Sequence, residues 1–368
     1  MNKKIIKMKV LRVINSLNIG GAERSIVGNV PLHIQNGIDI EVLLLNGKET
    51  FFFKELEKNN VKIHFLGKNN NVYNPILIFK FFKYINKYDI IHVSLFPALY
   101  WIALAKLIFR SKTKLIFTEH NTHNKRMKSF LFRWIDKILY KQYHHIVAIS
   151  PEANFNLSKH LGQQYPISTI YNGVDISKIK QGNNRKESLN FIPINKKILL
   201  QIAGFRVQKD QDTLIKALAL LPIKFHLLLV GDGPRMNICK DLAKSLNVHE
   251  RITFLGLRNN VEDILCSSDI VVLSSHWEGF GRSAVEGMAA SKPVIASNVA
   301  GLSQIVKDAG LLFEPGDYKT LSSLIINLDK NENLYTKVAL KCSERAQQYD
   351  IKKMVDDYER LYGVVKGE

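Results

Sequence analysis

Short apolar runs alternate with longer amphipathic stretches from one end of the chain to the other. The runs are rich in Val, Ile, Leu and Phe and are bounded by turn residues, which is typical of strands buried on both faces. Stretches such as 22–35, 76–87 and 98–109 have apolar residues at helical spacing. Strands and helices in this alternating order predict an α/β fold, with parallel sheets covered by helices on both faces.

The predicted strands form two groups. The first group comprises KVLRVINSL, IEVLLLN, VKIHFL, DIIHVSL, KLIFTEH, HIVAIS and ISTIYNG, and the second comprises ILLQIAG, FHLLLVGDG, ITFLGL, DIVVLSS, PVIAS and GLLFEP. Between them, residues at about 180–195 are polar and lack periodicity, which indicates a linker. We therefore expect two doubly wound, Rossmann-like domains, 1–180 and 190–347, with parallel sheets that face a central cleft. The last segment, 332–365, is expected to be helical only.

Two segments have some features of membrane-targeting sequences. Residues 1–17 are basic and then apolar, but basic residues interrupt the apolar run and no cleavage site follows, so a first strand is expected. Residues 90–109 are about long enough to span a bilayer. They contain His92, Pro97 and Lys106, and the sequence favours a buried strand followed by a short helix.

The cysteines are too far apart in the sequence to suggest a zinc site or a disulfide framework. They are Cys239, Cys266 and Cys342, with no CxxC pair. This pattern suits a reducing compartment, so we expect a cytoplasmic protein.

The positive charge is concentrated in the first half of the chain. The net charge is +19, and residues 1–180 contain 27 basic and 11 acidic residues. Such a surface faces nucleic acid, a phosphorylated substrate or an acidic membrane. The densest part, 124–143, interleaves basic residues with Phe, Trp, Leu and Ile. This segment is either an amphipathic helix in a lipid interface or a core-packed helix with a solvated basic face. Nucleic acid is disfavoured because no nucleic-acid-binding motif accompanies the charge.

The segment EGFGRSAVE carries two carboxylates, Glu278 and Glu286, directly after a predicted strand. Gly279 and Gly281 allow a tight turn, and a helix is expected to begin near Ser283. The N–H groups and the dipole of a helix start attract phosphate. Glu286 either binds a ligand or completes a capping box with Ser283. Glu278 has no evident structural task, so it is either a ligand contact or a solvated loop acid.

The segment GFRVQKDQD follows another predicted strand and precedes a helix. Arg206 and Lys209 can therefore project towards a ligand and neutralise phosphate. Asp210 and Asp212 have the DxD spacing of some metal sites. Because a helix follows directly, capping by one of them is favoured over metal binding.

Three further strand ends contain candidate ligand contacts. Gly231 lies in an incomplete dinucleotide-binding pattern, which is compatible with a nucleotide contact or a plain turn. Gly20 and Gly21 follow the first strand and allow a close approach to phosphate or sugar, whereas a tight strand–helix turn explains one glycine more easily than two. His120 and His123 have no third ligand nearby, so a hydrogen bond from His120 to a hydroxyl or phosphate is favoured over a metal.

In combination these segments resemble the retaining glycosyltransferases of family 4, which have the two-domain GT-B fold. The matching elements, in order, are Gly20–Gly21, ISPEA, YNGVD, QKDQDTLI, VGDGP, ITFLG, EGFGRSAVEGMA and KPVIAS. The most specific is E-x7-E, formed by Glu278 and Glu286.

The resemblance implies a donor site for a UDP- or GDP-sugar in the second domain. Glu286 would hold the ribose, Glu278 the donor sugar, and Arg206 and Lys209 the diphosphate in place of a metal cofactor. His120 would lie near the reacting sugar. The full implied set is catalytic His120, Lys209 and Glu278, with donor contacts from Gly20, Gly21, Arg206, Gly231, Phe280, Gly281, Arg282, Ser283 and Glu286. The last helix, about 348–368, would pack back on the first domain.

One position departs from the family pattern. Many members have an arginine where this chain has Gly204, and here Arg206 stands only three residues before Lys209. The implied reaction is front-face displacement onto a hydroxyl of a glycan or lipid-linked acceptor, in bacterial surface polysaccharide synthesis. With the basic first half, it implies a cytoplasmic protein that is either free or peripheral at the cytoplasmic face of the inner membrane. Two alternatives are a non-hydrolysing nucleotide-sugar 2-epimerase of the same architecture and a non-enzymatic binding protein.

Overall fold

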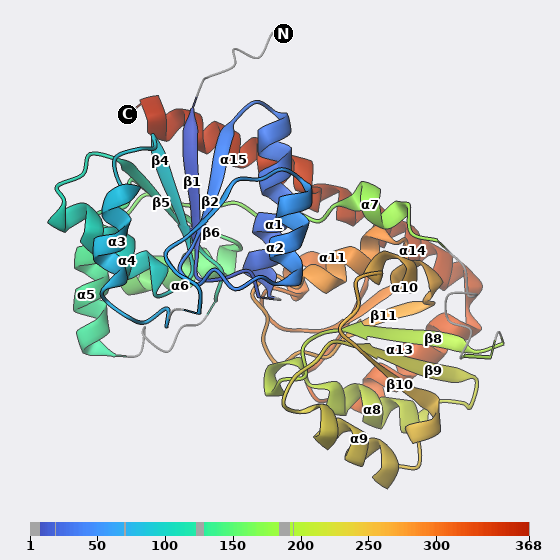
Figure 1. Cartoon of the computed structure of the whole chain (residues 1–368). Helices are drawn as coiled ribbons and strands as arrows, with labels where there is room; N and C mark the ends of the chain where they lie inside the picture. Colours follow the sequence, from blue (N-terminus) through green and yellow to red (C-terminus); the bar gives the residue numbers. More distant parts are fainter. Residues whose placement is uncertain are drawn as a thin grey trace. The chain divides into compact units, whose positions relative to one another are not determined.

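The computed structural model describes residues 8–18, 20–69, 71–122, 129–183, 192–193 and 195–367. The chain folds into two compact domains. The first contains the residues up to Gly173 together with those from Ile351 onwards, and the second is Val174–Asp350 (Figure 1). The cleft expected between the two domains stays a prediction.

The strands described in the first domain form one parallel sheet. They are β1 (Lys9–Ile14), β2 (Asp39–Leu44), β3 (Ile63–Phe65), β4 (Ile90–Ser94), β5 (Lys114–Glu119), β6 (His145–Ala148) and β7 (Ile167–Thr169). Their order is β3-β2-β1-β4-β5-β6-β7, so the direction of winding reverses between β1 and β4. The carboxyl ends at such a reversal are where doubly wound sheets bind ligands.

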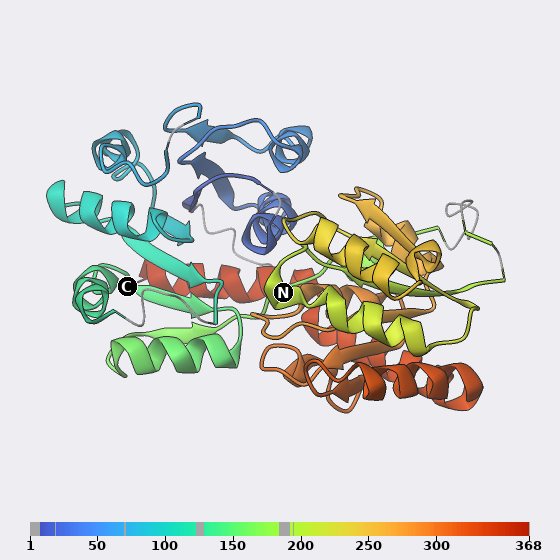
Figure 2. The ribbon, with the colours of Figure 1, turned by 90° about the horizontal axis from the view of Figure 1, so that it is seen from below.

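Helices cover both faces of this sheet (Figure 2). One layer is α1 (Gly21–Gln35), α2 (Phe51–Lys58) and α15 (Ile351–Gly367), and the other is α3 (Leu77–Lys80), η1 (Phe81–Lys83), α4 (Ala98–Ile108), α5 (Phe130–Tyr140) and α6 (Pro151–Leu161). Successive residues of β1 alternate between the two cores: Leu11 and Val13 face one, Val10 and Ile14 the other. Burial on both faces is why the strands appear in the sequence as continuous apolar runs.

The second domain repeats this architecture. Its described strands are β8 (Lys197–Ile202), β9 (Phe225–Val230), β10 (Ile252–Gly256), β11 (Ile270–Leu273), β12 (Val294–Ser297) and β13 (Leu311–Phe313), in the parallel order β10-β9-β8-β11-β12-β13. The helical segments are α7 (Ile176–Lys180), η4 (Val207–Lys209), α8 (Gln211–Leu220), α9 (Met236–Ser245), η5 (His249–Arg251), α10 (Val261–Ser267), α11 (Arg282–Ala289), α12 (Ser303–Val306), α13 (Tyr318–Lys330), α14 (Glu332–Ala346) and η6 (Gln347–Tyr349). Here the winding reverses between β8 and β11.

The predicted fold class is confirmed, and each predicted strand is present. Segment 90–109 divides into β4 and α4, as expected, whereas 76–87 forms only the short α3 and η1. None of the helices among the described residues is both long and apolar enough to cross a bilayer.

The boundary between the domains differs from the linker inferred from the sequence. The second domain begins at Val174, because α7 buries Ile176 and Ile179 and packs on α10 and α11. Part of the expected linker, 184–191 with 194, lies outside the described residues. The last helix, α15, belongs to the first domain, where Gly173 allows it a close approach: a Cβ on Gly173 would lie 2.5 Å from the Ile351 Cα.

Candidate functional site

Two loops lie side by side where the winding of the second sheet reverses. One follows β8 and contains η4, and the other follows β11 and leads into α11. Lys209 lies at the end of the first loop, and Glu278 lies in the second. Both side chains come from the carboxyl edge of the sheet, where ligands of doubly wound folds bind.

The side chains of Lys209 and Glu278 form an ion pair. The Ser275 hydroxyl lies 3.4 Å from the same carboxylate oxygen, Glu278 Oε2. The Lys209 side chain is 20% exposed and that of Glu278 14%, so both stay accessible from solvent. An ammonium and a carboxylate held together can bind a phosphate and sugar hydroxyls of one ligand, respectively.

Buried polar side chains fix the positions of these loops. Gln201 Nε2, in β8, donates to the Lys209 carbonyl at 3.0 Å and to Ser274 Oγ at 3.2 Å. Ser274 Oγ donates to the Asp210 carbonyl at 2.6 Å. Gln201 and Ser274 were missed in the sequence reasoning, although each is a polar residue within or directly after an apolar run, which was a usable signal.

The start of α11 rules out the capping box. The helix begins at Arg282, and its N-cap is Gly281, which has a left-handed backbone (φ 76°, ψ 46°) and no side chain. Ser283 lies inside the helix and donates to the Ile202 carbonyl at 2.8 Å. Glu286 is buried and accepts a 2.9 Å bond from Arg282 Nε. The capping reading of Glu286 was therefore wrong, and its ligand-binding reading stays a prediction.

The loop between Glu278 and α11 presents backbone rather than side chains. Phe280 is 2% exposed and packs against the Tyr349 ring, with centroids 5.5 Å apart. Gly301 covers the other side of the loop, since a Cβ there would lie 2.4 Å from the Glu278 carbonyl oxygen. The backbone amides of residues 280–283 remain the predicted donor contacts in this loop.

Gly231 has a structural reason to be glycine. Its φ is 139°, and a Cβ would lie 2.1 Å from the Ala203 carbonyl oxygen. Its N–H donates to the Gly256 carbonyl at 2.9 Å. Arg206 is exposed at the start of η4. The donor contacts expected of Gly231 and Arg206 both stay predictions.

The DQD element caps a helix, as the sequence favoured. Asp210 is the N-cap of α8, and its side chain accepts the Thr213 N–H at 3.3 Å. Asp212 pairs with Arg235 at 2.6 Å. Over the described part of the chain, no three His, Cys, Asp or Glu side chains are grouped in a way that could hold a metal.

In the first domain, His120 lies directly after β5, and His123 lies outside the described residues. His120 Nε2 is 3.4 Å from the Ser94 hydroxyl, at the end of the neighbouring strand β4. Burial, and secondarily the Arg12 cation, lowers the pKa of His120 to about 3. The imidazole is therefore neutral at pH 7 and able both to donate and to accept a hydrogen bond.

Arg12 belongs to a buried polar network that the sequence did not indicate. One Arg12 Nη donates to His92 Nδ1 at 2.8 Å and to the Tyr362 hydroxyl at 2.9 Å. His92 Nε2 is then the donor to the Thr118 hydroxyl at 2.7 Å. Burial, followed by the charge of Arg12, lowers the pKa of His92 well below its ordinary value. The network joins β1, β4 and β5 to α15.

Gly20 and Gly21 lie at the carboxyl end of β1. Gly20 has an extended backbone (φ −162°), which any residue adopts, and a Cβ there would meet only the flexible end of Glu23. A Cβ on Gly21 would meet nothing within 4 Å. The described contacts therefore do not require glycine at either position for steric reasons. The close approach of a ligand to Gly20 and Gly21 stays a prediction.

Family comparisons cover both domains. Residues 19–178 match the family described as Glycosyltransferase Family 4, and residues 184–349 match Glycosyl transferases group 1. The chain belongs to the GT-B glycosyltransferases.

Two curated relatives and one solved structure illustrate the similarity of this glycosyltransferase to known proteins. N-acetyl-alpha-D-glucosaminyl L-malate synthase of Bacillus anthracis is 33% identical over 53% of each chain, so this match spans only about half the relative. The N-acetylgalactosamine-N,N'-diacetylbacillosaminyl-diphospho-undecaprenol 4-alpha-N-acetylgalactosaminyltransferase of Campylobacter jejuni subsp. jejuni serotype O:2 is 26% identical over 94% of this chain and 96% of the relative. The structure of Anabaena Alr3699/HepE with UDP-glucose has a TM-score of 0.87, with 23% identity over 97% of this chain and 100% of that one.

The glycosyltransferase also has an unusual surface helix, α5, within the basic segment 124–143. Residues 124–128 lie outside the described part. α5 buries Asp136, Leu139 and Tyr140, but several of its apolar side chains are exposed beside its basic ones, namely Phe130, Leu131, Phe132, Trp134 and Ile138. One alternative for this segment was a core-packed helix with a solvated basic face. That description of α5 is incomplete, because apolar side chains are exposed to solvent together with the basic ones.

Proposed function

We propose that this protein is a retaining, metal-independent family 4 glycosyltransferase. It transfers a sugar from a nucleoside diphosphate sugar, linked to UDP or GDP, to a hydroxyl of a lipid-linked saccharide in surface polysaccharide synthesis. The observation that carries the proposal is the Lys209–Glu278 ion pair at the reversal of the second sheet. The Campylobacter relative, whose name specifies a diphospho-undecaprenol saccharide, supports the acceptor class, and the HepE complex with UDP-glucose supports the donor class.

In the proposed donor complex, the diphosphate replaces Glu278 as the partner of Lys209. A dianionic diphosphate binds an ammonium more strongly than one carboxylate does, so the ion pair holds Lys209 in place until the donor arrives. Glu278 is then released to accept hydrogen bonds from the donor sugar. Glu286, which has no capping task, binds the ribose hydroxyls at the start of α11.

The proposed reaction needs no nucleophile from the protein. The bond between the anomeric carbon and the diphosphate oxygen breaks, and the acceptor oxygen forms a new bond on the same face. The acceptor proton passes to the departing diphosphate. Lys209 stabilises the charge that develops on this leaving group, which is electrostatic catalysis by a preorganised cation. His120, neutral because of its low pKa, bonds to the reacting sugar without adding charge.

The epimerase alternative is disfavoured, because the family matches and the curated relatives are glycosyltransferases. The two activities differ in their need for a second substrate. An epimerase converts a nucleotide sugar alone, whereas a transferase releases nucleotide in proportion to added acceptor. Acceptor-dependent release of nucleotide therefore separates them.

The test begins with a thermal-shift screen of UDP- and GDP-sugars, followed by transfer assays with the best stabiliser. Lys209→Ala and Glu278→Ala should each lower kcat/KM by at least about 100-fold, the loss typical of a group that stabilises developing charge. Lys216→Ala, which removes an exposed lysine of α8, is the matched control and should behave as wild type. Folded Lys209→Ala and Glu278→Ala variants with normal turnover would refute the proposed site.

A further inference from the structure

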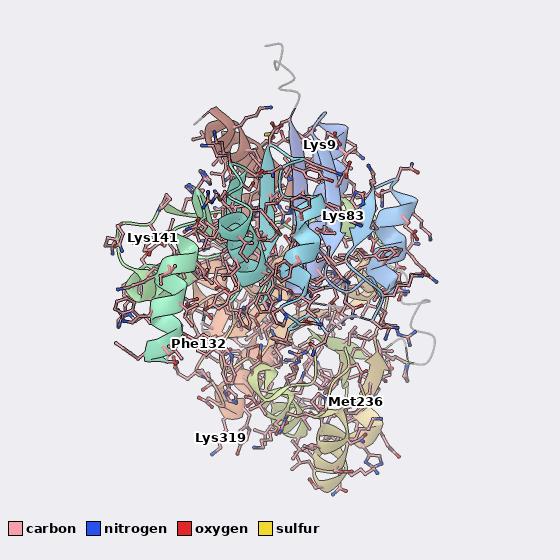
Figure 3. The ribbon with its side chains drawn as sticks, turned by 60° about the vertical axis from the view of Figure 1, so that its left-hand side comes forward. Lys9, Lys83, Phe132, Lys141, Met236 and Lys319 are labelled. Carbon is pink, nitrogen blue, oxygen red and sulfur yellow. The ribbon has the colours of Figure 1, made fainter. Side chains whose placement is uncertain are left out.

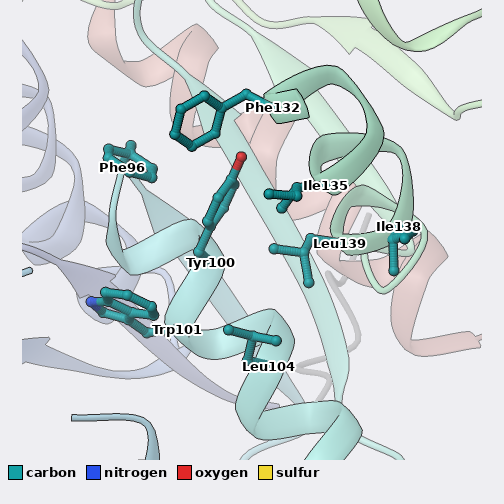
Figure 4. Close-up of a pocket in the computed structure, with 8 residues that line it drawn as sticks. All are labelled: Phe96, Tyr100, Trp101, Leu104, Phe132, Ile135, Ile138 and Leu139. Atoms are coloured by element: carbon teal, nitrogen blue, oxygen red, sulfur yellow. The ribbon is translucent and has the colours of Figure 1, made fainter. Parts of the chain in front are cut away.

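An apolar groove lies in the first domain between α4 and α5 (Figure 4). Its volume is about 500 Å³, and it is lined by the rings of Phe96, Tyr100, Trp101 and Phe132 and by four aliphatic side chains. The polar atoms of the rings are already bonded, the Tyr100 hydroxyl to Asp136 and the Trp101 N–H to the Val72 carbonyl at 2.8 Å. Pockets for nucleotides and sugars include polar groups that orient the ligand. A groove without them suits a hydrocarbon chain.

One end of the groove lies at the carboxyl edge of the first sheet. Phe96 is two residues beyond β4, and its carbonyl accepts a 2.8 Å bond from Asn15, directly after β1. Ser94, at the end of β4, is the residue that contacts His120. From Phe96 the groove runs along α4 to Leu104 (Figure 4). A chain in the groove therefore begins beside the strand ends that carry His120 and extends away from them.

The outer side of α5 continues this apolar surface. Phe130 is 79% exposed, Trp134 59% and Ile138 53%, at the i, i+4, i+8 spacing of one helix face. Leu131, beside them, is 67% exposed. A solvated helix normally has polar residues on its outer face, and an apolar patch of this kind marks an interaction surface.

The charge around the groove is positive. Along α4 and α5 as described, the one carboxylate is Asp136, which is buried and bonded to Tyr100 and His160. The basic side chains on these helices and at the end of α5 are Lys106, Arg133, Lys137 and Lys141, with Phe132 and Lys141 towards opposite ends of α5 in Figure 3. An apolar channel with a cationic surround matches an anionic amphiphile. It disfavours a second copy of this chain, because two such surfaces repel each other.

We propose that this groove binds the polyprenyl chain of a lipid-linked, phosphorylated acceptor, with its phosphate end beside Phe96 and Phe132. The inference rests on the proposed function and specifies where that acceptor is held. An acceptor lipid, unlike a bulk bilayer lipid, must deliver its head group to the reacting sugar, and the groove opens at the strand ends that carry His120. The aromatic rings pack against the methyl branches of the isoprene units.

The first experiment measures binding without transfer. Farnesyl phosphate, a short isoprenoid phosphate, should quench the fluorescence of the protein, whereas inorganic phosphate should not. Trp101→Phe should weaken the quench, because Trp101 lines the groove, and Trp277→Phe, in the second domain, should keep it. Filling the groove with the double change Leu104→Phe/Ile135→Phe should weaken farnesyl phosphate binding at least tenfold. Leu107→Phe/Ile108→Phe, on the exposed side of α4, is the matched control and should bind as wild type.

The second experiment measures transfer to a polyprenyl-diphosphate-linked saccharide and to the same saccharide on a short alkyl chain. The groove-filling variant should raise KM at least tenfold for the polyprenyl acceptor only, with circular dichroism showing that the variant is folded. If the groove-filling variant and the matched control Leu107→Phe/Ile108→Phe have equal KM values for the polyprenyl acceptor, the groove is not the acceptor site. The proposed transferase activity would be unaffected by that result. Farnesyl phosphate binding without transfer from any nucleotide sugar would refute the proposed function instead. Equal binding of dodecyl phosphate, or loss of a dimer on filling the groove, would overturn the polyprenyl occupant.

Discussion

At the residue scale, the two carboxylates of DQD are each engaged in bonds within the fold. Asp210 has a left-handed backbone (φ 44°) and accepts a 2.6 Å bond from the Thr213 hydroxyl as well as the N–H that it caps. Asp212 bonds to Arg235. A metal at this position would have to displace both sets of bonds.

Transfer is therefore expected to persist without divalent metal. EDTA in excess should leave the rate unchanged, and Asp212→Ala should stay within about twofold of wild type, because it removes only a partly exposed ion pair. Asp210 is unsuitable for this test, since losing its cap costs about 1 kcal/mol by itself. A DxD metal site would instead make EDTA and Asp212→Ala both inhibitory, with recovery of the EDTA-treated enzyme on adding Mn²⁺ or Mg²⁺.

At the element scale, the sequence predicted the strands, and α11 to within one residue of its start, better than it predicted how α11 is capped. Strands such as β1 have apolar residues facing both cores, and this burial is visible in the sequence as a run of mostly apolar residues. The start of α11 depends on the left-handed backbone of Gly281. Ser283 has the sequence signature of a cap but lies inside the helix, bonded to Ile202 of β8. The position of Ser283 thus depends on a tertiary contact, and such a contact cannot be predicted from the local sequence pattern.

The loop after β9 offers a test of whether Gly231 is required by the fold. In Gly231→Ala the new Cβ would lie 2.1 Å from the Ala203 carbonyl oxygen, so the backbone must shift. In Gly256→Ala the φ of 65° is also left-handed, but nothing lies within 4 Å of the Cβ. Gly256→Ala should cost about 1–2 kcal/mol of unfolding free energy. Gly231→Ala should cost several kcal/mol, because the clash adds to backbone strain.

Thermal or urea unfolding of the full chain, read by circular dichroism, checks this difference. Equal stability of the two variants would show that the loop adapts freely. Gly231 would then be explained better by the predicted donor contact than by packing.

At the scale of the whole molecule, two doubly wound domains followed from the order of elements, but the buried polar network did not. Arg12 looked like an interruption in an apolar run, whereas its guanidinium bonds to Tyr362, 350 positions away. The same holds for α15, which joins the first domain through buried Met354 and Tyr358. Such long-range partners depend on the tertiary fold, and the E-x7-E motif indicated the site only through a family resemblance.

Three histidines with lowered pKa values make the stability of the first domain depend on pH. Burial, with the charge of Arg12, lowers the pKa values of His92 and His120, and that of His120 is about 3. Burial is also the largest cause of the lowered pKa of His33. Histidines in the unfolded chain have a pKa near 6.5. Below that pH the unfolded chain therefore binds more protons than the folded domain does. The stabilisation is complete above pH 6.5 and is lost as pH falls from 6.5 towards the folded pKa values.

The unfolding free energy should therefore fall between pH 6.5 and 4.5, by up to about 1.4 kcal/mol per pH unit for each fully buried histidine. His120→Gln removes one of these titrating groups. Its structural cost should be small, since the ring has one described hydrogen bond, at 3.4 Å. Its plot of unfolding free energy against pH should be flatter than that of wild type by up to one proton. Urea titrations across this range measure both slopes. Identical slopes for His120→Gln and wild type would mean that His120 titrates in the folded protein as it does in the unfolded chain, and would remove the neutral imidazole from the proposed site.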